Sequence, residues 1–259
     1  MALAHRALDR REGLVVLGIS GAQGSGKSTI AAALHQALDA QGVTTATLSL
    51  DDLYCTHAER QRLASTVHPL LATRGVPGTH DVALGLATIA ALERGEPALL
   101  PRFDKARDDR RKPEPVDCAP PHTRMLLFEG WCIGALPQPD AALIAPINPL
   151  EAEADVAGHW RGYANAALAG VYRTLWARID ALAMLRAPDF ATIVTWRQEQ
   201  EHALREATGP APGVMSDAEV IRFVAHYERI TRQILIDLPG HADCVIDLDA
   251  CRRVVGIRP

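Results

Sequence analysis

The sequence predicts an α/β fold in which a mainly parallel sheet lies between two layers of helices. Residues 14–20 (LVVLGIS) are a short apolar run, a glycine-rich turn follows, and residues 28–42 repeat apolar side chains at helical spacing. A second apolar run at residues 43–50 completes a β–α–β unit, whose crossover connection should be right-handed. Apolar runs at residues 123–131 and 243–249 predict further strands of the same sheet.

The segments between these runs predict the remaining elements. Residues 81–95 are typical of a helix, and residues 100–122 form a long, charged, proline-rich excursion that is either a functional loop or a disordered one. Helical sequence dominates residues 150–185, whereas FATIVTW at residues 190–196 favours a strand. Residues 216–235 predict one amphipathic helix with Ser216 or Asp217 as its cap.

Composition limits the function classes. The chain has 259 residues, is 48% hydrophobic and carries a formal net charge of -4, which favours one globular domain over a protein that coats nucleic acid or an anionic membrane. Five cysteines without a C-x-x-C pair or zinc-site spacing favour a reduced compartment. No apolar run reaches the roughly 20 residues of a membrane span, and the N-terminus lacks a signal-peptide core, so we expect a cytoplasmic protein.

Residues 21–28 (GAQGSGKS) satisfy the phosphate-binding pattern G-x-x-x-x-G-K-S between a predicted strand and a predicted helix. Glycines allow backbone N–H groups to crowd around phosphate oxygens, while Lys27 neutralises the β- and γ-phosphates and the Ser28 hydroxyl ligates Mg²⁺. A chance match is on the order of one in a thousand in a chain with so few lysines. The residues predicted to bind ATP and Mg²⁺ are Gly21, Ala22, Gln23, Gly24, Ser25, Gly26, Lys27, Ser28 and Thr29.

Two carboxylates follow predicted strands. Asp51 comes after the strand at residues 43–50, which should neighbour the strand at 14–20, and there it can take a proton from a hydroxyl that attacks the γ-phosphate. A helix cap is the alternative for Asp51, and Asp52 competes for the same catalytic role. Glu129 ends the run LLFE, as expected of a residue that holds Mg²⁺ directly or through water, with an N-cap carboxylate as the alternative.

These motifs together resemble the P-loop kinases that include uridine kinase, phosphoribulokinase and pantothenate kinase, and most closely the plant-type D-glycerate 3-kinase branch. The similar blocks are SLDDLY (49–54), with Leu53 in place of an aromatic residue, RGVPGTHD (74–81), LPRFDKARDDR (100–110), FEGWCIGALPQ (128–138), PINPLE (146–151), WRQEQE (196–201) and HYERITR (226–232). The resemblance covers residues 14–249. It implies a single P-loop kinase domain over residues 1–259, with its core at 14–249, substrate loops at 56–81 and 100–122, and a helical insertion at 150–186.

The resemblance implies ATP- and Mg²⁺-dependent phosphorylation of a hydroxyl on a small molecule, with D-glycerate, converted to 3-phosphoglycerate, as the first candidate. Asp51 takes the catalytic position together with Lys27 and Glu129, Ser28 and Glu129 hold the metal, and Arg197 covers the phosphates. The residues implied to bind the acceptor are Asp51, Tyr54, Arg74, His80, Asp81, Arg102, Asp104, Lys105 and Arg110.

Simpler interpretations stay open for several of these residues. The charge run at 102–112 also fits a solvated surface, Asp81 fits a helix cap, and Arg197 and the arginines of residues 226–232 fit exposed positions. We expect Trp131 and Trp160 to pack in the core. Another acceptor (a nucleoside, pantothenate or a different sugar acid) and a nucleotide-dependent regulatory protein without acceptor turnover are alternatives. The sequence leaves open the oligomeric state, the base of the donor and the phosphorylated position.

Overall fold

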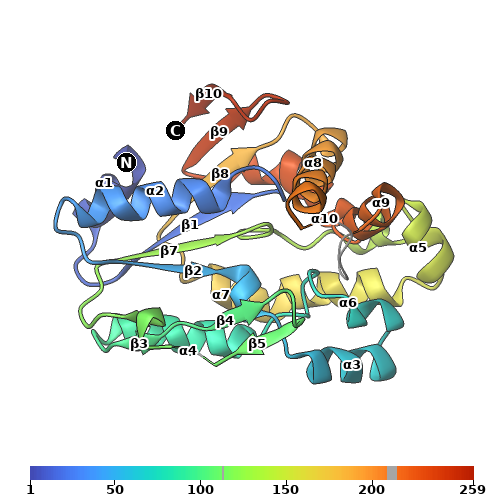
Figure 1. Cartoon of the computed structure of the whole chain (residues 1–259), viewed down its shortest axis with the longest axis horizontal. Coiled ribbons are helices and arrows are strands. Elements are labelled where there is room, and N and C mark those ends of the chain that lie inside the picture. Colours follow the sequence, from blue (N-terminus) through green and yellow to red (C-terminus); the bar gives the residue numbers. More distant parts are fainter. Residues whose placement is uncertain (113, 209–214) are drawn as a thin grey trace.

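A six-stranded sheet forms the centre of the computed structural model, which describes residues 1–112, 114–208 and 215–259 (Figure 1). Its strands are β1 (Val15–Gly21), β2 (Thr45–Ser49), β7 (Met125–Gly130), β8 (Ala181–Arg186), β9 (Cys244–Leu248) and β10 (Val254–Arg258). The strand order is β10-β9-β8-β1-β7-β2, and each neighbouring pair is parallel except β9 and β10. The predicted α/β fold with a mainly parallel sheet is therefore confirmed.

Helices cover both faces of the sheet (Figure 1). They are α1 (Ala2–Arg10), α2 (Lys27–Asp39), α3 (His57–Thr66), α4 (Val82–Glu93), α5 (Pro149–Ala154), α6 (His159–Ala167), α7 (Arg173–Trp176), α8 (Phe190–Thr208), α9 (Asp217–Ala225) and α10 (Glu228–Asp237). Strand side chains alternate between the faces, so Val15 and Leu17 pack with Leu38 of α2, whereas Val16 and Leu126 pack with Ile89 of α4. None of the described helices has the length and apolarity needed to cross a membrane.

Short helical turns and small strands complete the chain. The 3₁₀ turns are η1 (Leu50–Leu53), η2 (Pro69–Ala72), η3 (Pro115–Asp117), η4 (Asp140–Leu143) and η6 (Leu238–Gly240), and η5 (Leu168–Tyr172) is a π turn between α6 and α7. The excursion at residues 100–122 is folded in its described part, with Pro113 outside the described residues. It holds the hairpin of β4 (Arg102–Asp104) and β5 (Asp109–Arg111), followed by β6 (Cys118–Ala119), which pairs with β3 (Ala98–Leu99).

The strand order corrects one sequence expectation. The strand before Asp51 does not neighbour the P-loop strand, because β7 lies between β1 and β2. Glu129 on β7 is in register with Ile19 of β1 on one side and with Ser49 of β2 on the other. The carboxyl ends of all three strands therefore meet at one edge of the sheet, where open α/β sheets bind ligands.

Two expectations about helices and strands were also wrong. Residues 190–196 belong to α8 and not to a strand, because Phe190, Ile193 and Trp196 are all buried at a three-residue spacing that only a helix brings to one face. The helical segment expected over residues 150–186 ends before β8, in which Ala181, Leu182, Met184 and Leu185 are buried as in a central parallel strand.

The amphipathic segment at residues 216–235 forms two helices, α9 and α10, and Ser216 caps the first of them. The chain breaks at His226 and Tyr227. Val224 of α9 packs in the cluster that contains Trp196, whereas Ile230 of α10 packs in the larger cluster on the other side of the sheet. The two helices therefore contribute to different clusters.

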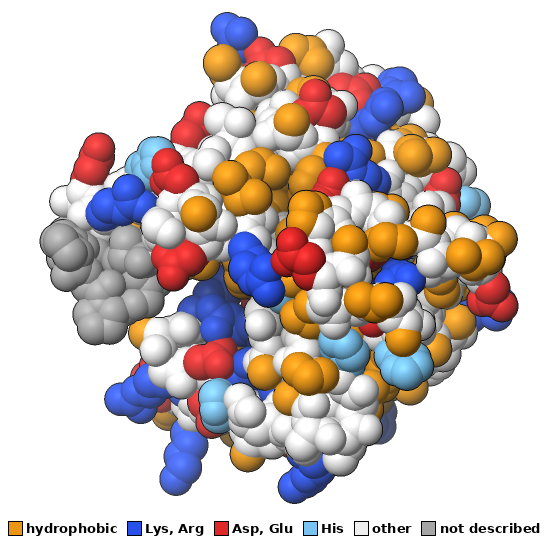
Figure 2. All heavy atoms as spheres, turned by 90° about the vertical axis from the view of Figure 1, so that its right-hand side faces the viewer, with side chains coloured by type: hydrophobic (Ala, Val, Ile, Leu, Met, Phe, Trp, Pro, Cys, Tyr) orange, Lys and Arg blue, Asp and Glu red, His pale blue; other side chains and the backbone are white. Residues whose placement is uncertain are grey.

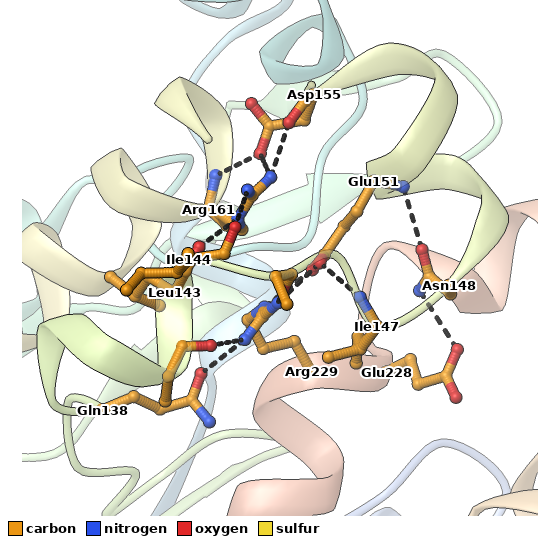
Figure 3. A network of polar contacts seen from close by, with 12 residues as sticks. Gln138, Leu143, Ile144, Ile147, Asn148, Glu151, Asp155, Arg161, Glu228 and Arg229 are labelled. Carbon is orange, nitrogen blue, oxygen red and sulfur yellow. Dashed lines mark hydrogen bonds and ion pairs between the residues drawn. The ribbon is translucent and has the colours of Figure 1, made fainter. Parts of the chain in front are cut away.

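A buried polar network holds the helices between β7 and β8 (Figure 3). Arg229 of α10, for which an exposed position was the simpler interpretation, is 7% exposed and donates to both carboxylate oxygens of Glu151, at 2.8 and 2.6 Å. Arg161 pairs with buried Asp155 and donates to the carbonyls of Leu143 and Ile144. Because a buried charge is stable only when it is paired, these arginines fix the loop before α5.

Candidate active site

A cavity of about 490 Å³ opens at the carboxyl ends of β1, β2 and β7. Figure 2 shows a hollow on the side of the molecule that faces right in Figure 1, with Lys and Arg side chains along it. The residues predicted to bind ATP or Mg²⁺ that line it are Gln23, Gly24, Lys27, Ser28, Glu129 and Arg197. The residues predicted to bind the acceptor that line it are Asp51, Tyr54, Arg74 and Lys105. Ten residues that the sequence predicted for the site are thus brought together here.

The glycine-rich loop has the backbone that phosphate binding requires. Gly24 and Gly26 have φ values of +78° and +85°, and Gly26 caps α2, which begins at Lys27. A Cβ atom on Gly24 would lie 2.7 Å from Cβ of Trp196, so only glycine fits there. The helix begins directly at the cavity, which turns its unpaired N–H groups toward a bound anion.

Glu129 and Ser28 form a pair at the base of the cavity. Ser28 Oγ donates to Glu129 Oε1 at 2.9 Å, and Lys27 Nζ lies 4.0 Å from Oε2. Glu129 is buried, and its Oε2 atom accepts no hydrogen bond from the described part of the chain. No cluster of three His, Cys, Asp or Glu side chains suited to a metal occurs among the described residues. This donor set of one hydroxyl and one carboxylate fits Mg²⁺, which keeps waters and phosphate oxygens as its other ligands.

Asp51 is held at the cavity by two neighbours. Tyr54 Oη donates to its Oδ1 at 2.8 Å, and Lys105 Nζ lies 2.6 Å from its Oδ2. Burial alone would raise the pKa of Asp51, but the charges of Lys105 and Lys27 outweigh it and lower the pKa to about 2. Asp51 is therefore ionised and able to accept a hydrogen bond from a bound hydroxyl.

Asp52 points to a different part of the structure. It accepts a hydrogen bond from the Phe103 backbone N–H at 3.0 Å and from Arg102 at 3.2 Å, so it anchors the β4–β5 hairpin. Burial raises the pKa of Asp52 above its ordinary value. The geometry therefore favours Asp51 over Asp52 as the carboxylate that meets a substrate.

Five residues predicted to bind the acceptor do not line this cavity, because other groups already hold them. Arg102 pairs with Asp52 and Asp117, and Arg110 pairs with Asp81 and donates to the Tyr54 carbonyl. Asp81 also caps α4, which was the simpler interpretation of that residue. The Asp104 carboxylate accepts hydrogen bonds from the Ala106 and Arg107 backbone N–H groups and so holds the turn of the β4–β5 hairpin.

His80 is the fifth of these residues, and it lies behind the cavity wall. It is 5% exposed, stacks on Tyr54 at 4.7 Å between ring centres, and its Nδ1 lies 2.5 Å from Tyr172 Oη. Burial lowers the pKa of His80 to about 4, so the ring is neutral at physiological pH. His80 thus supports Tyr54 from behind and does not face the space in which a substrate fits.

The sequence is similar to those of two kinases from other organisms. No family model matches the sequence. The uncharacterized kinase mug58 of Schizosaccharomyces pombe is 36% identical over 221 residues, which cover 82% of this chain and 78% of that protein. The chloroplastic D-glycerate 3-kinase of Arabidopsis thaliana is 32% identical over 224 residues, covering 82% of this chain and 46% of the plant protein. The chain belongs to the D-glycerate 3-kinase branch of the P-loop kinases.

The fold of this kinase agrees with the sequence relationship. The solved structure of D-glycerate 3-kinase from Cryptococcus neoformans superposes with a TM-score of 0.82 and 26% identity, and the match covers 99% of this chain and 96% of that chain. The protein is accordingly an ATP-dependent phosphotransferase that acts on an alcohol group of a small molecule.

Sequence reasoning missed several residues that line the cavity of this kinase. They are Ser49, Trp131, Gln200, Leu204, Phe223 and Tyr227. Trp131 follows Glu129 by two residues, so its place at the end of β7 was a usable signal. Tyr227 had no such signal, because its spacing with Ile230 and Ile234 is that of a core residue, and only the break between α9 and α10 turns it to the cavity.

Arg197 enters the cavity of the kinase from the middle of α8. It pairs with the fully buried Glu201 at 2.6 Å, and its guanidinium lies 5.8 Å from the centre of the Phe223 ring. Glu201 also accepts a hydrogen bond from the Met215 backbone N–H. Arg197 is therefore a fixed cation on the same side of the cavity as the glycine-rich loop, and it is not a surface residue.

Proposed function

We propose that this kinase transfers the γ-phosphoryl group of Mg²⁺-bound ATP to the 3-hydroxyl of D-glycerate, which gives 3-phosphoglycerate and ADP. The observation that carries the proposal is that Arg74 and Lys105 line the same cavity as Asp51 and the glycine-rich loop, and that Lys105 lies against Asp51. Two cations at this place suit an acceptor with a carboxylate. The relatives from Arabidopsis and Cryptococcus are named D-glycerate 3-kinases, which supports the same acceptor.

The residues divide into a donor side and an acceptor side. We propose that the loop N–H groups, Lys27 and Arg197 hold the phosphates, and that Ser28 and Glu129 hold Mg²⁺. The metal would neutralise charge on the β- and γ-phosphates. The glycerate oxygen forms the new bond to phosphorus as the bond to the ADP oxygen breaks, and Asp51 takes the hydroxyl proton. Tyr54 holds Asp51 in place through the hydrogen bond to Oδ1.

Carboxylate recognition belongs to Arg74 and Lys105 in this proposal. A guanidinium can grip a carboxylate with two parallel charge-assisted hydrogen bonds. The Arg74 guanidinium forms an ion pair with Asp108 through Nη1, and Arg74 still lines the cavity. Lys105 reaches Asp51 from the hairpin, with 60% of its side chain exposed.

The acceptor carboxylate can be tested by comparing glycerate with glycerol and glyceraldehyde at matched concentrations. Each neutral compound should react about 10- to 100-fold less efficiently for every lost ionic contact, because it leaves a desolvated cation unpaired. Arg74→Ala should remove most of this preference. Arg107→Ala is the control, because Arg107 lies in the turn of the β4–β5 hairpin, is mostly exposed and lies outside the cavity. The measurement is kcat/KM from ADP release for each acceptor. Equal efficiency with all three compounds would contradict the proposal and favour a nucleoside or a neutral sugar.

We also expect little ADP release in the absence of an acceptor. A kinase must keep water from the γ-phosphate until the correct hydroxyl is bound, so turnover should rise when glycerate is added. A coupled ADP assay with and without glycerate measures this. Rapid ADP release without an acceptor would indicate an NTPase, and ATP binding without turnover of any acceptor would favour the regulatory alternative.

A cytoplasmic location stays a prediction.

A further inference from the structure

Two aromatic side chains hold the backbone that carries Arg74. Tyr227 Oη donates to the Arg74 carbonyl at 3.1 Å, and Trp131 Nε1 donates to the Gly75 carbonyl at 3.0 Å. Both rings line the cavity and are nearly fully buried, with exposures of 2% and 3%. Their ring centres lie 4.9 Å apart at an interplanar angle of 80°. Two side chains from distant parts of the sequence thus meet at this one turn.

The turn itself is built to let Tyr227 approach. Gly75 has a φ of +138°, and a Cβ atom there would lie only 2.1 Å from Tyr227 Oη. Any larger residue would push the hydroxyl away from the Arg74 carbonyl. Gly75 N–H also donates to Thr79 Oγ1 at 3.0 Å, which holds the same turn from its other side.

The guanidinium of Arg74 is held as firmly as its backbone. It pairs with Asp108 of the hairpin, which Arg60 also binds at 2.8 Å, and it lies 5.7 Å from the centre of the Phe103 ring. Arg74 is therefore fixed at both ends of its side chain before a substrate arrives. Such preorganisation lowers the entropic cost of binding a ligand.

Tyr227 also contacts a neighbour of Arg197. It lies one helical turn after Phe223, whose ring contacts it at 5.2 Å and also lies beside Arg197 of the donor side. Burial raises the pKa of Tyr227, and the negative charge of Asp51 raises it further by a smaller amount. The hydroxyl therefore keeps its proton and remains a hydrogen-bond donor. The hydroxyl of Tyr54 donates to Asp51.

We propose that Tyr227 is a positioning residue for the acceptor, because its hydroxyl fixes the backbone of Arg74 and so aims the guanidinium at the acceptor carboxylate. This inference rests on the proposed function, which it deepens by naming a residue that determines specificity for acids. Tyr227 acts through Arg74, so removal of its hydroxyl should weaken the binding only of substrates that Arg74 binds.

The test is the kinetics of Tyr227→Phe, which removes one hydrogen bond and keeps the ring. One neutral hydrogen bond is worth about 0.5 to 1.5 kcal/mol, so KM for glycerate should rise about 2- to 12-fold. KM for ATP should stay within about twofold, and the low rate with glycerol should not change. Tyr163→Phe is the matched control, because this tyrosine of α6 lies outside the cavity.

A double-mutant cycle separates positioning from general damage. In the Arg74→Ala background, Tyr227→Phe should have no further effect on KM for glycerate. A full effect in both backgrounds, or equal losses with glycerate, glycerol and ATP, would overturn the inference and leave the proposed function intact. If the wild-type enzyme phosphorylates another acid instead of glycerate, the proposed function fails and the cycle is measured with that acid. If it phosphorylates only neutral alcohols, both proposals are wrong.

Discussion

Asp51→Asn should lower kcat about 10²- to 10⁴-fold and leave KM for ATP within about twofold. Asparagine keeps the size of the side chain and can still meet Tyr54, but it cannot take the proton of the attacking hydroxyl. In the proposed function the nucleotide is bound by the glycine-rich loop and Lys27, and Asp51 meets the acceptor hydroxyl, so the substitution should hardly affect ATP binding. Steady-state kinetics with ATP and glycerate varied in turn would show whether the two parameters separate in this way.

Asp52→Asn is the matched comparison for this prediction. Asp52 binds Arg102 and the Phe103 N–H, so its substitution should disturb the hairpin and raise KM for the acceptor more than it lowers kcat. Near-normal kcat for Asp51→Asn together with a large loss for Asp52→Asn would move the base to Asp52.

The low pKa of Asp51 predicts how kcat/KM depends on pH. Because the pKa is about 2, the carboxylate is already deprotonated throughout the range from pH 7 down to pH 5. The value of kcat/KM, which reports the free enzyme, should therefore show no acidic decline caused by Asp51 in that range. A decline in the wild type that disappears in Asp51→Asn would contradict the electrostatic environment given by Lys105 and Lys27.

Lys27→Ala should lower kcat about 10²-fold or more and also raise KM for ATP. The ammonium group lies beside Glu129 with 15% of its side chain exposed, so its charge is little screened by water. Loss of a fixed charge that stabilises the transferring phosphoryl group typically costs about 10²- to 10³-fold in rate.

Lys112→Ala is the control for Lys27→Ala, because Lys112 is an exposed lysine outside the cavity. ATP binding measured by calorimetry together with turnover would separate the two effects of Lys27. Turnover of Lys27→Ala within tenfold of the wild type would show that the glycine-rich loop does not hold the reacting phosphates.

The sequence by itself determined the parts of the site that depend on neighbouring residues. The glycine-rich loop needs only a strand, glycines with positive φ and a helix that begins at Lys27, and all of these are contiguous in the chain. Glu129 could be predicted equally well from the sequence, because an apolar strand that ends in an acid places that acid at the ligand-binding edge of a parallel sheet. The resemblance to kinases supplied the reaction, and the comparisons support it.

Only the tertiary structure decided which charged residues face the cavity. Arg74, Arg102 and Arg110 look alike in the sequence, but Arg102 and Arg110 are held by Asp52, Asp117 and Asp81, which come from other segments. The choice between Asp51 and Asp52 depends on the β4–β5 hairpin in the same way, and the place of Tyr227 depends on where α9 breaks. Long-range packing sets these distances, and an ion pair forms wherever a carboxylate comes within reach of a cation. Local patterns carry no information about those distances, which is why the glycine-rich loop was predictable and the residues that line the rest of the cavity were predictable only in part.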